Sequence, residues 1–152
     1  VFGKHTIVAG QQPARRPWCS KTMMGKMIMN HAFSKLLNAD RRGTATVKLY
    51  PISKNIAGFL HIMKYRGYIK DFDVHSPERR GSITVDLLGR IKDCRILMYR
   101  KDLKVMNIAD YIQLTLPTKQ WGYVVILTPR GLMDHEEAIK QNEGGRIVGY
   151  FH

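Results

Sequence analysis

The side chains that could support catalysis are few in this sequence. His135 and Glu136 begin like the helical zinc-protease motif, but that motif needs a second histidine four residues later, where Ile139 stands. Asp71 and Asp73 alternate along a predicted strand and share one face, where solvated charges opposite basic residues are commoner than a catalytic pair. No phosphate-binding Walker loop, dinucleotide fingerprint or Gly-x-Ser-x-Gly elbow occurs in the chain. The sequence therefore predicts a protein that is not an enzyme and uses neither a metal nor a cofactor.

Two short segments instead have the chemistry of an anion-binding site. Ser53 and Lys54 lie in the first turn of a predicted helix, where free backbone N–H groups and the helix dipole favour a phosphate. The segment Thr128-Pro129-Arg130-Gly131 places a hydroxyl, a cation and backbone donors at the tip of a loop. Helix capping with a solvated lysine is an equally good explanation of Ser53 and Lys54, so these residues alone leave both interpretations open.

The charge balance indicates an acidic partner. The chain has 25 Lys and Arg against 12 Asp and Glu, a formal net charge of +13 at pH 7. Nucleic acid is the leading candidate, and an anionic membrane surface is the runner-up. No helix pairs a basic face with a large apolar one, and no apolar run approaches the roughly 20 residues that span a bilayer, so we expect no membrane partner.

The two cysteines, Cys19 and Cys94, are too few for a disulfide framework and form no Cys-x-x-Cys metal motif. We therefore expect two unpaired thiols in a reducing compartment. Paired arginines occur at Arg41-Arg42 and at Arg79-Arg80, each followed by glycine. A solvated turn is the default interpretation of such a pair, and contact with phosphate is the alternative in a chain this basic.

Hydrophobic periodicity predicts the elements that position these residues. In the first half it predicts a helix at 27–38, a strand at 44–50, a helix from Ile52 closed by Gly67, and a hairpin of strands 68–75 and 82–88. In the second half it predicts a strand at 95–99, a strand at 121–127, the loop at 128–131, a short helix capped by Asp134 and ended by Gly144-Gly145, and a final alternating strand. Residues 100–115 show weak periodicity and receive no assignment.

This order predicts an α+β protein with two small domains. Residues 24–90 form the first, with the order helix-strand-helix-strand-strand, and residues 91–152 form the second, mainly antiparallel strands with one short helix. Residues 1–23 are predicted to be a basic N-terminal extension, because they have two prolines and no sustained helical period, and no acidic residue precedes Asp40. Such a leader fits a mitochondrial transit peptide, an rRNA-binding tail, or upstream sequence that docks nowhere.

Seven motifs in order, from about Met24 onward, resemble one known family, the universal small-subunit ribosomal protein eight, called fifteen-A in eukaryotes. They are Asn38-Ala39-Asp40-Arg41-Arg42-Gly43, Pro51-Ile52-Ser53-Lys54, Gly67-Tyr68-Ile69-Lys70-Asp71-Phe72, Gly89-Arg90, Leu116-Pro117-Thr118-Lys119-Gln120-Trp121-Gly122, Gly131-Leu132-Met133-Asp134-His135-Glu136-Glu137-Ala138 and Gly144-Gly145. The resemblance implies two α+β domains and a structural protein that binds and stabilises the central domain of small-subunit rRNA. It also implies neighbouring small-subunit proteins as partners, with protein five as a candidate, and no small-molecule substrate.

The resemblance also implies which residues contact RNA. It assigns Ser53 and Lys54 to one contact, and the loop from Thr128 to Gly131 to another, although Pro129 replaces the serine of the family loop and so removes one hydroxyl and one backbone N–H. It makes Gly144 and Gly145 a second contact turn, beside the charge of Arg146, and favours phosphate contact for Arg41 and Arg42. Recognition should rest on RNA shape, phosphates and 2′-hydroxyls more than on base sequence.

The sequence also leads to an expected cellular compartment and to two alternative functions. Tyr99-Arg100, Trp121-Gly122-Tyr123 and Leu127-Thr128-Pro129 resemble the plant mitochondrial subgroup of the family, whose cytosolic form has phenylalanine at the position of Trp121 and Thr-Ser in the loop. A mitochondrial ribosome is therefore the preferred location and the cytosolic ribosome the alternative. A free RNA-binding regulator outside the ribosome is the alternative function, and an enzyme acting on RNA is disfavoured by the missing catalytic groups.

Overall fold

The structure, a computed structural model, describes residues 20–75, 81–116 and 121–152. Most of the predicted N-terminal extension, Cys19, and the hairpin turn with Arg79 and Arg80 lie outside these residues. The elements are α1 (Ser20–Arg41), β1 (Thr46–Leu49), α2 (Lys54–Tyr65), β2 (Ile69–His75), β3 (Ser82–Leu87), β4 (Cys94–Ile96), β5 (Asp102–Leu103), the 3-10 helix η2 (Val105–Asn107), α3 (Ile108–Thr115), β6 (Tyr123–Thr128), β7 (Gly131–Asp134), α4 (His135–Lys140) and β8 (Gly145–Phe151).

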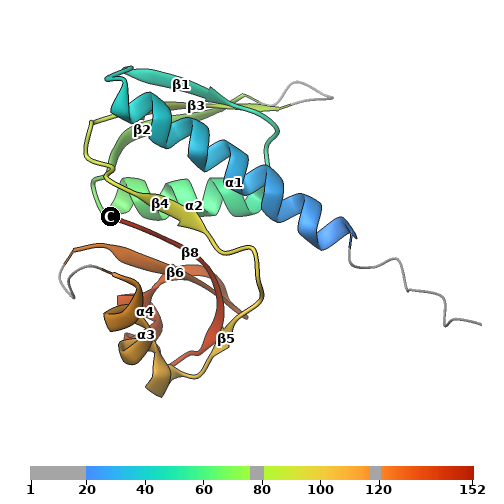
Figure 1. Ribbon diagram of the computed structural model, residues 1–152, viewed down its shortest axis with the longest axis vertical. Coiled ribbons are helices and arrows are strands. Elements are labelled where there is room, and N and C mark those ends of the chain that lie inside the picture. The colour runs from blue at the N-terminus through green and yellow to red at the C-terminus, as the bar shows by residue number, and fades with distance from the viewer. Residues whose placement is uncertain (1–19, 76–80, 117–120) are drawn as a thin grey trace, which may run out of the picture.

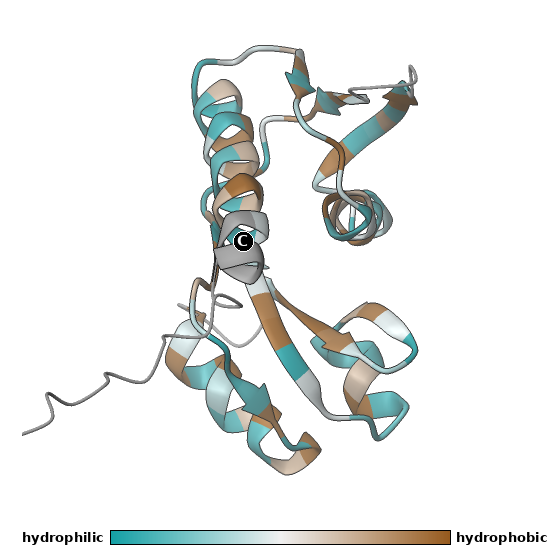
Figure 2. Cartoon of the chain, turned by 90° about the vertical axis from the view of Figure 1, so that its right-hand side faces the viewer, coloured by the Kyte–Doolittle hydropathy of each residue, from teal (hydrophilic) through white to brown (hydrophobic). Residues whose placement is uncertain are grey.

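The first part of the chain is a three-stranded antiparallel sheet with α1 and α2 on one face (Figure 1). The strand order is β1-β3-β2, so the predicted hairpin pairs as expected and β1 is an edge strand. Alternation on β1 buries Val47 and Leu49 and leaves Lys48 exposed. Polar and apolar segments alternate along α1 (Figure 2), whose buried residues Phe33 and Leu36 face the sheet and α2.

The second part is a five-stranded antiparallel sheet in which β8 is central. Its order is β4-β8-β6-β7, and β5 pairs with the beginning of β8. Helix α4 follows β7 directly because Asp134 caps it, with the Glu137 N–H donating to the carboxylate at 2.9 Å. The α+β class and the predicted cap are confirmed.

The structure corrects four details of the predicted elements. Helix α1 begins at Ser20, inside the predicted extension, and continues to Arg41. Helix α2 begins at Lys54 and not at Ile52, because Ser53 is still extended, with φ −132° and ψ 143°. Residues 131–134, predicted to be loop and cap, form strand β7. The unassigned stretch contains α3, so the second part has a helix besides the one predicted.

The main hydrophobic core crosses from the first part into the second. Phe59 of α2 packs against Phe33 of α1 and against Phe151 of β8, with ring centroids 4.5 and 5.6 Å apart. Ile91 and Cys94, just beyond the predicted join, are also buried in this core. Cys94 is a free thiol, and burial raises its pKa well above the ordinary range.

Candidate RNA-binding surface

Strand pairing brings the two predicted contact turns together. Strands β6 and β8 are antiparallel, and Leu127 stands opposite Arg146, so the end of β6 meets the beginning of β8. A surface depression of about 400 Å³ results, lined by Asp102, Leu103, Leu127, Thr128, Pro129, Gly144, Gly145 and Arg146. We call this depression, together with the adjoining loop residues Arg130 and Gly131, the turn surface. The loop and the glycine pair, which the sequence separates by more than ten residues, therefore form one site.

The glycines of the turn surface are required by the fold itself. A Cβ on Gly145 would lie 2.4 Å from the Leu127 carbonyl oxygen, and one on Gly144 would lie 2.6 Å from the Leu103 carbonyl oxygen. Gly131 has a φ of 143°, which side chains rarely allow, although the space around it is open. Of these three glycines, only Gly131 has open space where a side chain would lie, so another molecule could approach its backbone there.

Several polar groups of the turn surface already form hydrogen bonds or ion pairs within the chain. The Thr128 hydroxyl donates to the Gly131 carbonyl at 3.1 Å, and Thr128 is only 5% exposed, so its proton closes the turn. Arg130 Nε lies 2.7 Å from a Glu143 carboxylate oxygen, yet 68% of the side chain is exposed. Arg146 Nε lies 2.9 Å from Asp102 Oδ1. The guanidinium groups thus remain on the surface, each oriented by a carboxylate.

The beginning of α2 offers unused donors on the same side of the molecule. Ser53 is the N-cap residue, but its side chain makes no capping hydrogen bond, and no acidic residue stands in the first turn. This geometry removes the capping explanation for Ser53. Lys54 is exposed and lies one helical turn before Gly58, which packs against Leu132 of β7. Figure 2 shows α2 end-on, viewed from the side where the helix begins.

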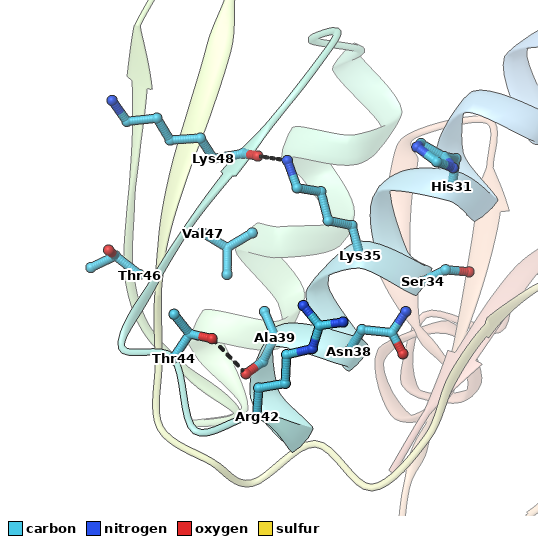
Figure 3. A pocket seen from close by; sticks show the side chains of 10 residues that line it. All are labelled: His31, Ser34, Lys35, Asn38, Ala39, Arg42, Thr44, Thr46, Val47 and Lys48. Carbon is cyan, nitrogen blue, oxygen red and sulfur yellow. Dashed lines mark hydrogen bonds between the residues drawn. The ribbon is translucent and has the colours of Figure 1, made fainter.

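Arg41 and Arg42 lie elsewhere. They close α1 at the start of β1, whereas Ser53 follows the end of that strand. Arg42 borders a groove of about 540 Å³ between α1 and β1 (Figure 3), whose lining residues are His31, Ser34, Lys35, Asn38, Ala39, Arg42, Thr44, Thr46, Val47 and Lys48. The Lys35 ammonium reaches across this groove to donate to the Lys48 carbonyl at 2.8 Å. The groove has several cations and no carboxylate in its lining, so it is a basic surface separate from the turn surface.

Arg66 is the centre of an ion-pair network that the sequence did not predict. Arg66, at the end of α2, donates from Nε to Asp134 Oδ2 at 2.6 Å and pairs with Glu136 at 2.8 Å. Burial alone would lower the pKa of Arg66, but the hydrogen bonds and charges of Asp134 and Glu136 raise it overall. Asp134 is 1% exposed, so the network fixes α2 against α4 inside the molecule. No sequence signal links partners that are 68 residues apart.

Within the described residues, no group of three His, Cys, Asp or Glu side chains could hold a metal ion. His135, the first residue of the incomplete zinc motif, is buried, and its Nδ1 accepts from the Val124 N–H at 3.2 Å. A helix long and apolar enough to cross a membrane is likewise missing from the part of the chain that the structure describes.

Comparison with known proteins decides the family. The sequence matches the ribosomal protein S8 family over residues 27–152. The chain belongs to the ribosomal protein S8 family. It is 55% identical over 129 residues to the small ribosomal subunit proteins uS8mz and uS8my of Arabidopsis thaliana, which covers 85% of this chain and all of each relative. The S8 family is structural, which confirms the prediction that the chain is not an enzyme.

Proposed function

We propose that this S8-family chain is a structural constituent of the small ribosomal subunit that binds and stabilises the central domain of the small-subunit rRNA. The observation that carries the proposal is the turn surface, where two turns predicted to contact RNA form one site. Family membership supports it, as do the printed names of the Arabidopsis relatives, which are small-subunit proteins. The net charge of +13 supplies the attraction for RNA.

The proposed contact has two parts on one side of the molecule. The free N–H groups at the start of α2, with Ser53 and Lys54, hold a phosphate by directed hydrogen bonds and charge. At the turn surface, the partly exposed backbone of Gly131, Gly144 and Gly145 approaches the sugar-phosphate chain. Arg130 and Arg146 add charge-assisted bonds. Thr128 orders the turn, and the ring of Pro129 packs on a ribose or base. Arg41 and Arg42 make a separate phosphate contact.

Neighbouring small-subunit proteins, with protein five as a candidate, are the proposed protein partners. Membership of a ribosomal protein family supports ribosomal proteins as neighbours, and such a neighbour would cover Met106 and Leu114, which are strongly exposed near α3. We further propose the mitochondrial ribosome as the location, with the cytosolic ribosome as the alternative. The basic, acid-free composition of residues 1–23 supports import. Fractionation of the tagged full-length protein would separate the two compartments.

Co-sedimentation tests the proposed function. Small subunits purified through a high-salt sucrose gradient should contain the chain in equal amounts with other constituents. A free RNA-binding regulator, the alternative function, would remain in the soluble fraction after the high-salt wash. Recovery only in that fraction would therefore contradict the proposal.

A further inference from the structure

A second surface combines cations with an exposed aromatic ring. Trp121, immediately before β6, is 60% exposed, and the Lys92 ammonium lies 4.7 Å from its ring centroid. Both residues line a depression of about 220 Å³ together with Arg66, Gly67, Tyr68, Arg90 and His152. No Asp or Glu side chain belongs to this lining. Two of its three cations, Arg90 and Lys92, are exposed, whereas Arg66 is neutralised by Asp134 and Glu136.

The backbone that carries these cations is held on both sides. The Asp40 carboxylate accepts from the N–H groups of Gly89 and Ile91, each at 3.1 Å. The His152 carbonyl accepts from Lys92 N–H at 2.7 Å and from the next N–H at 3.0 Å. Ile91 is buried between its two exposed neighbours, so alternation directs Arg90 and Lys92 outward. The cations are therefore presented by an ordered segment, which lowers the entropic cost of binding.

The backbone next to the ring is held in a comparable way. Gly122, the next residue, has a φ of 118°, and a Cβ there would lie 2.8 Å from His152 Cβ and 3.0 Å from the Phe151 carbonyl oxygen. Trp121 therefore enters β6 on a backbone that packs tightly against the end of β8. His152 adds a buried Nδ1 that has no hydrogen-bond partner among the described residues. The Trp121 indole, the cations of Arg90 and Lys92, and the unpaired Nδ1 of His152 therefore lie around one depression.

We propose that Arg90, Lys92 and Trp121 form a second RNA contact that takes an unpaired nucleotide, with its base on the indole and its phosphate on the two cations. Every base has a face that stacks on an aromatic ring. The negative phosphate pairs with the positive charges of Arg90 and Lys92. A paired base is already stacked in its helix, so single-stranded RNA is the class of ligand that fits. This inference rests on the proposed function, because it assumes an RNA partner.

The contact is distinct from the turn surface. It lies at the end of β8, whereas the turn surface lies at its beginning, and seven residues of extended chain separate the two by about 20 Å. Figure 1 shows the marked C-terminus beside the end of α2, away from the point where that helix begins. One RNA junction that reached both surfaces would therefore have to span this distance.

Tryptophan fluorescence tests the site directly. The chain has two tryptophans, so Trp18→Phe leaves Trp121 as the single reporter. We expect single-stranded oligouridylate to quench its emission and a blunt RNA duplex of equal length to have little effect. Labelled oligouridylate should bind Trp121→Ala at least about fivefold more weakly, with Trp121→Phe intermediate. Lys92→Ala should weaken binding more than Lys70→Ala, which removes an exposed lysine from β2.

Unchanged Trp121 emission at saturating oligouridylate, or parental affinity in Trp121→Ala, would overturn the inference. The same variants are then titrated with the central-domain rRNA fragment. If the parent binds this fragment and Lys54→Ala weakens binding while Trp121→Ala does not, the nucleotide contact is wrong and the proposed function stands. If the parent does not bind the fragment at all, the proposed function is wrong, and the oligouridylate titration still decides the Trp121 contact.

Discussion

Lys54 has two possible roles, a solvated lysine at a helix start or a contact with RNA phosphate, and the structure helps to separate them. It stands at the start of α2 with an exposed ammonium, and the neighbouring Ser53 hydroxyl makes no capping bond. We expect Lys54→Ala and Ser53→Ala to weaken binding to the central-domain rRNA fragment about threefold to tenfold, because each removes one directed contact. Their free energies of unfolding should change by less than about 0.5 kcal/mol. Filter binding and urea unfolding measure the two quantities.

Lys70→Ala is the matched control, because Lys70 is an exposed lysine of the same part of the chain, outside the proposed contact. It should bind RNA nearly as well as the parent. If Lys54→Ala and Lys70→Ala weaken binding equally, only the overall charge matters and the start of α2 is not a contact.

His135 gives the fold a dependence on pH. It is 6% exposed, and its Nδ1 must carry a lone pair to accept from the Val124 N–H. Burial lowers the pKa of His135, while Glu136 and Asp134 act in the opposite direction. The unfolded chain therefore binds the proton more readily, with a pKa near 6.5. The stabilisation is complete above about pH 6.5 and declines as the pH falls, by at most roughly 1.4 kcal/mol per pH unit.

Urea unfolding at pH 8.0 and pH 5.5 measures this effect against His135→Gln, which cannot titrate. We expect the parent to lose more stability than the variant between these values, since the other five histidines are common to both chains. An equal loss would show that His135 does not carry the pH dependence.

At the scale of the element, the β6–β7 turn is ordered mainly by its own bonds. Thr128 closes it, Gly131 supplies the unusual φ, and Arg130 stands out beside Glu143. We expect Arg130→Ala to weaken RNA binding by about 1 kcal/mol, because it removes a charge-assisted bond that is partly offset by Glu143. Pro129→Ser should bind slightly more tightly or equally, since a new hydroxyl donor is offset by greater flexibility. Titration of both variants with the central-domain fragment measures these changes in affinity. If Arg130→Ala binds normally and Pro129→Ser binds poorly, the proline ring is the contact.

The elements that the sequence predicted well have a continuous apolar run or a clear capping signal. The apolar run before Thr128 predicted β6, and Asp134 followed by two glutamates predicted the start of α4. Strand β7 was missed because its four residues are too few to show alternation and include the capping aspartate. Helix α3 has only eight residues and follows a 3-10 turn, so its periodicity was too short to recognise.

The candidate site could be predicted only in part, for a related reason. Local chemistry suggested Lys54 and Arg130, and the family resemblance suggested the glycine pair. The joining of Thr128 to Gly144 and Gly145 depends on strand pairing, which local patterns do not specify. The carboxylates that pair with Arg130 and Arg146 could not be predicted from local sequence patterns either. The Trp121 surface was missed because it joins three separate segments of the chain.

At the scale of the whole molecule, one core joins the two parts. Phe151, in the last strand, packs against Phe59 and Tyr68 of the first part, with ring centroids 5.6 and 4.9 Å apart. We expect the chain to unfold in a single transition, and Phe151→Ala to lower the free energy of unfolding by about 3 to 5 kcal/mol. Circular dichroism and Trp121 fluorescence during urea unfolding check this. Two separated transitions in the parent would show that residues 24–90 and 91–152 unfold independently.

The central claim, that this S8-family chain holds small-subunit rRNA through phosphate contacts, is tested most directly by the salt dependence of its affinity for a central-domain rRNA fragment. If three to five of Lys54, Arg130, Arg146, Arg41 and Arg42 neutralise phosphates, log K should fall linearly with log salt concentration, with a slope between about −2 and −4.5. Lys54→Ala should make that slope shallower by a little less than about one. A nearly flat response, or no saturable binding at low salt, would contradict the account.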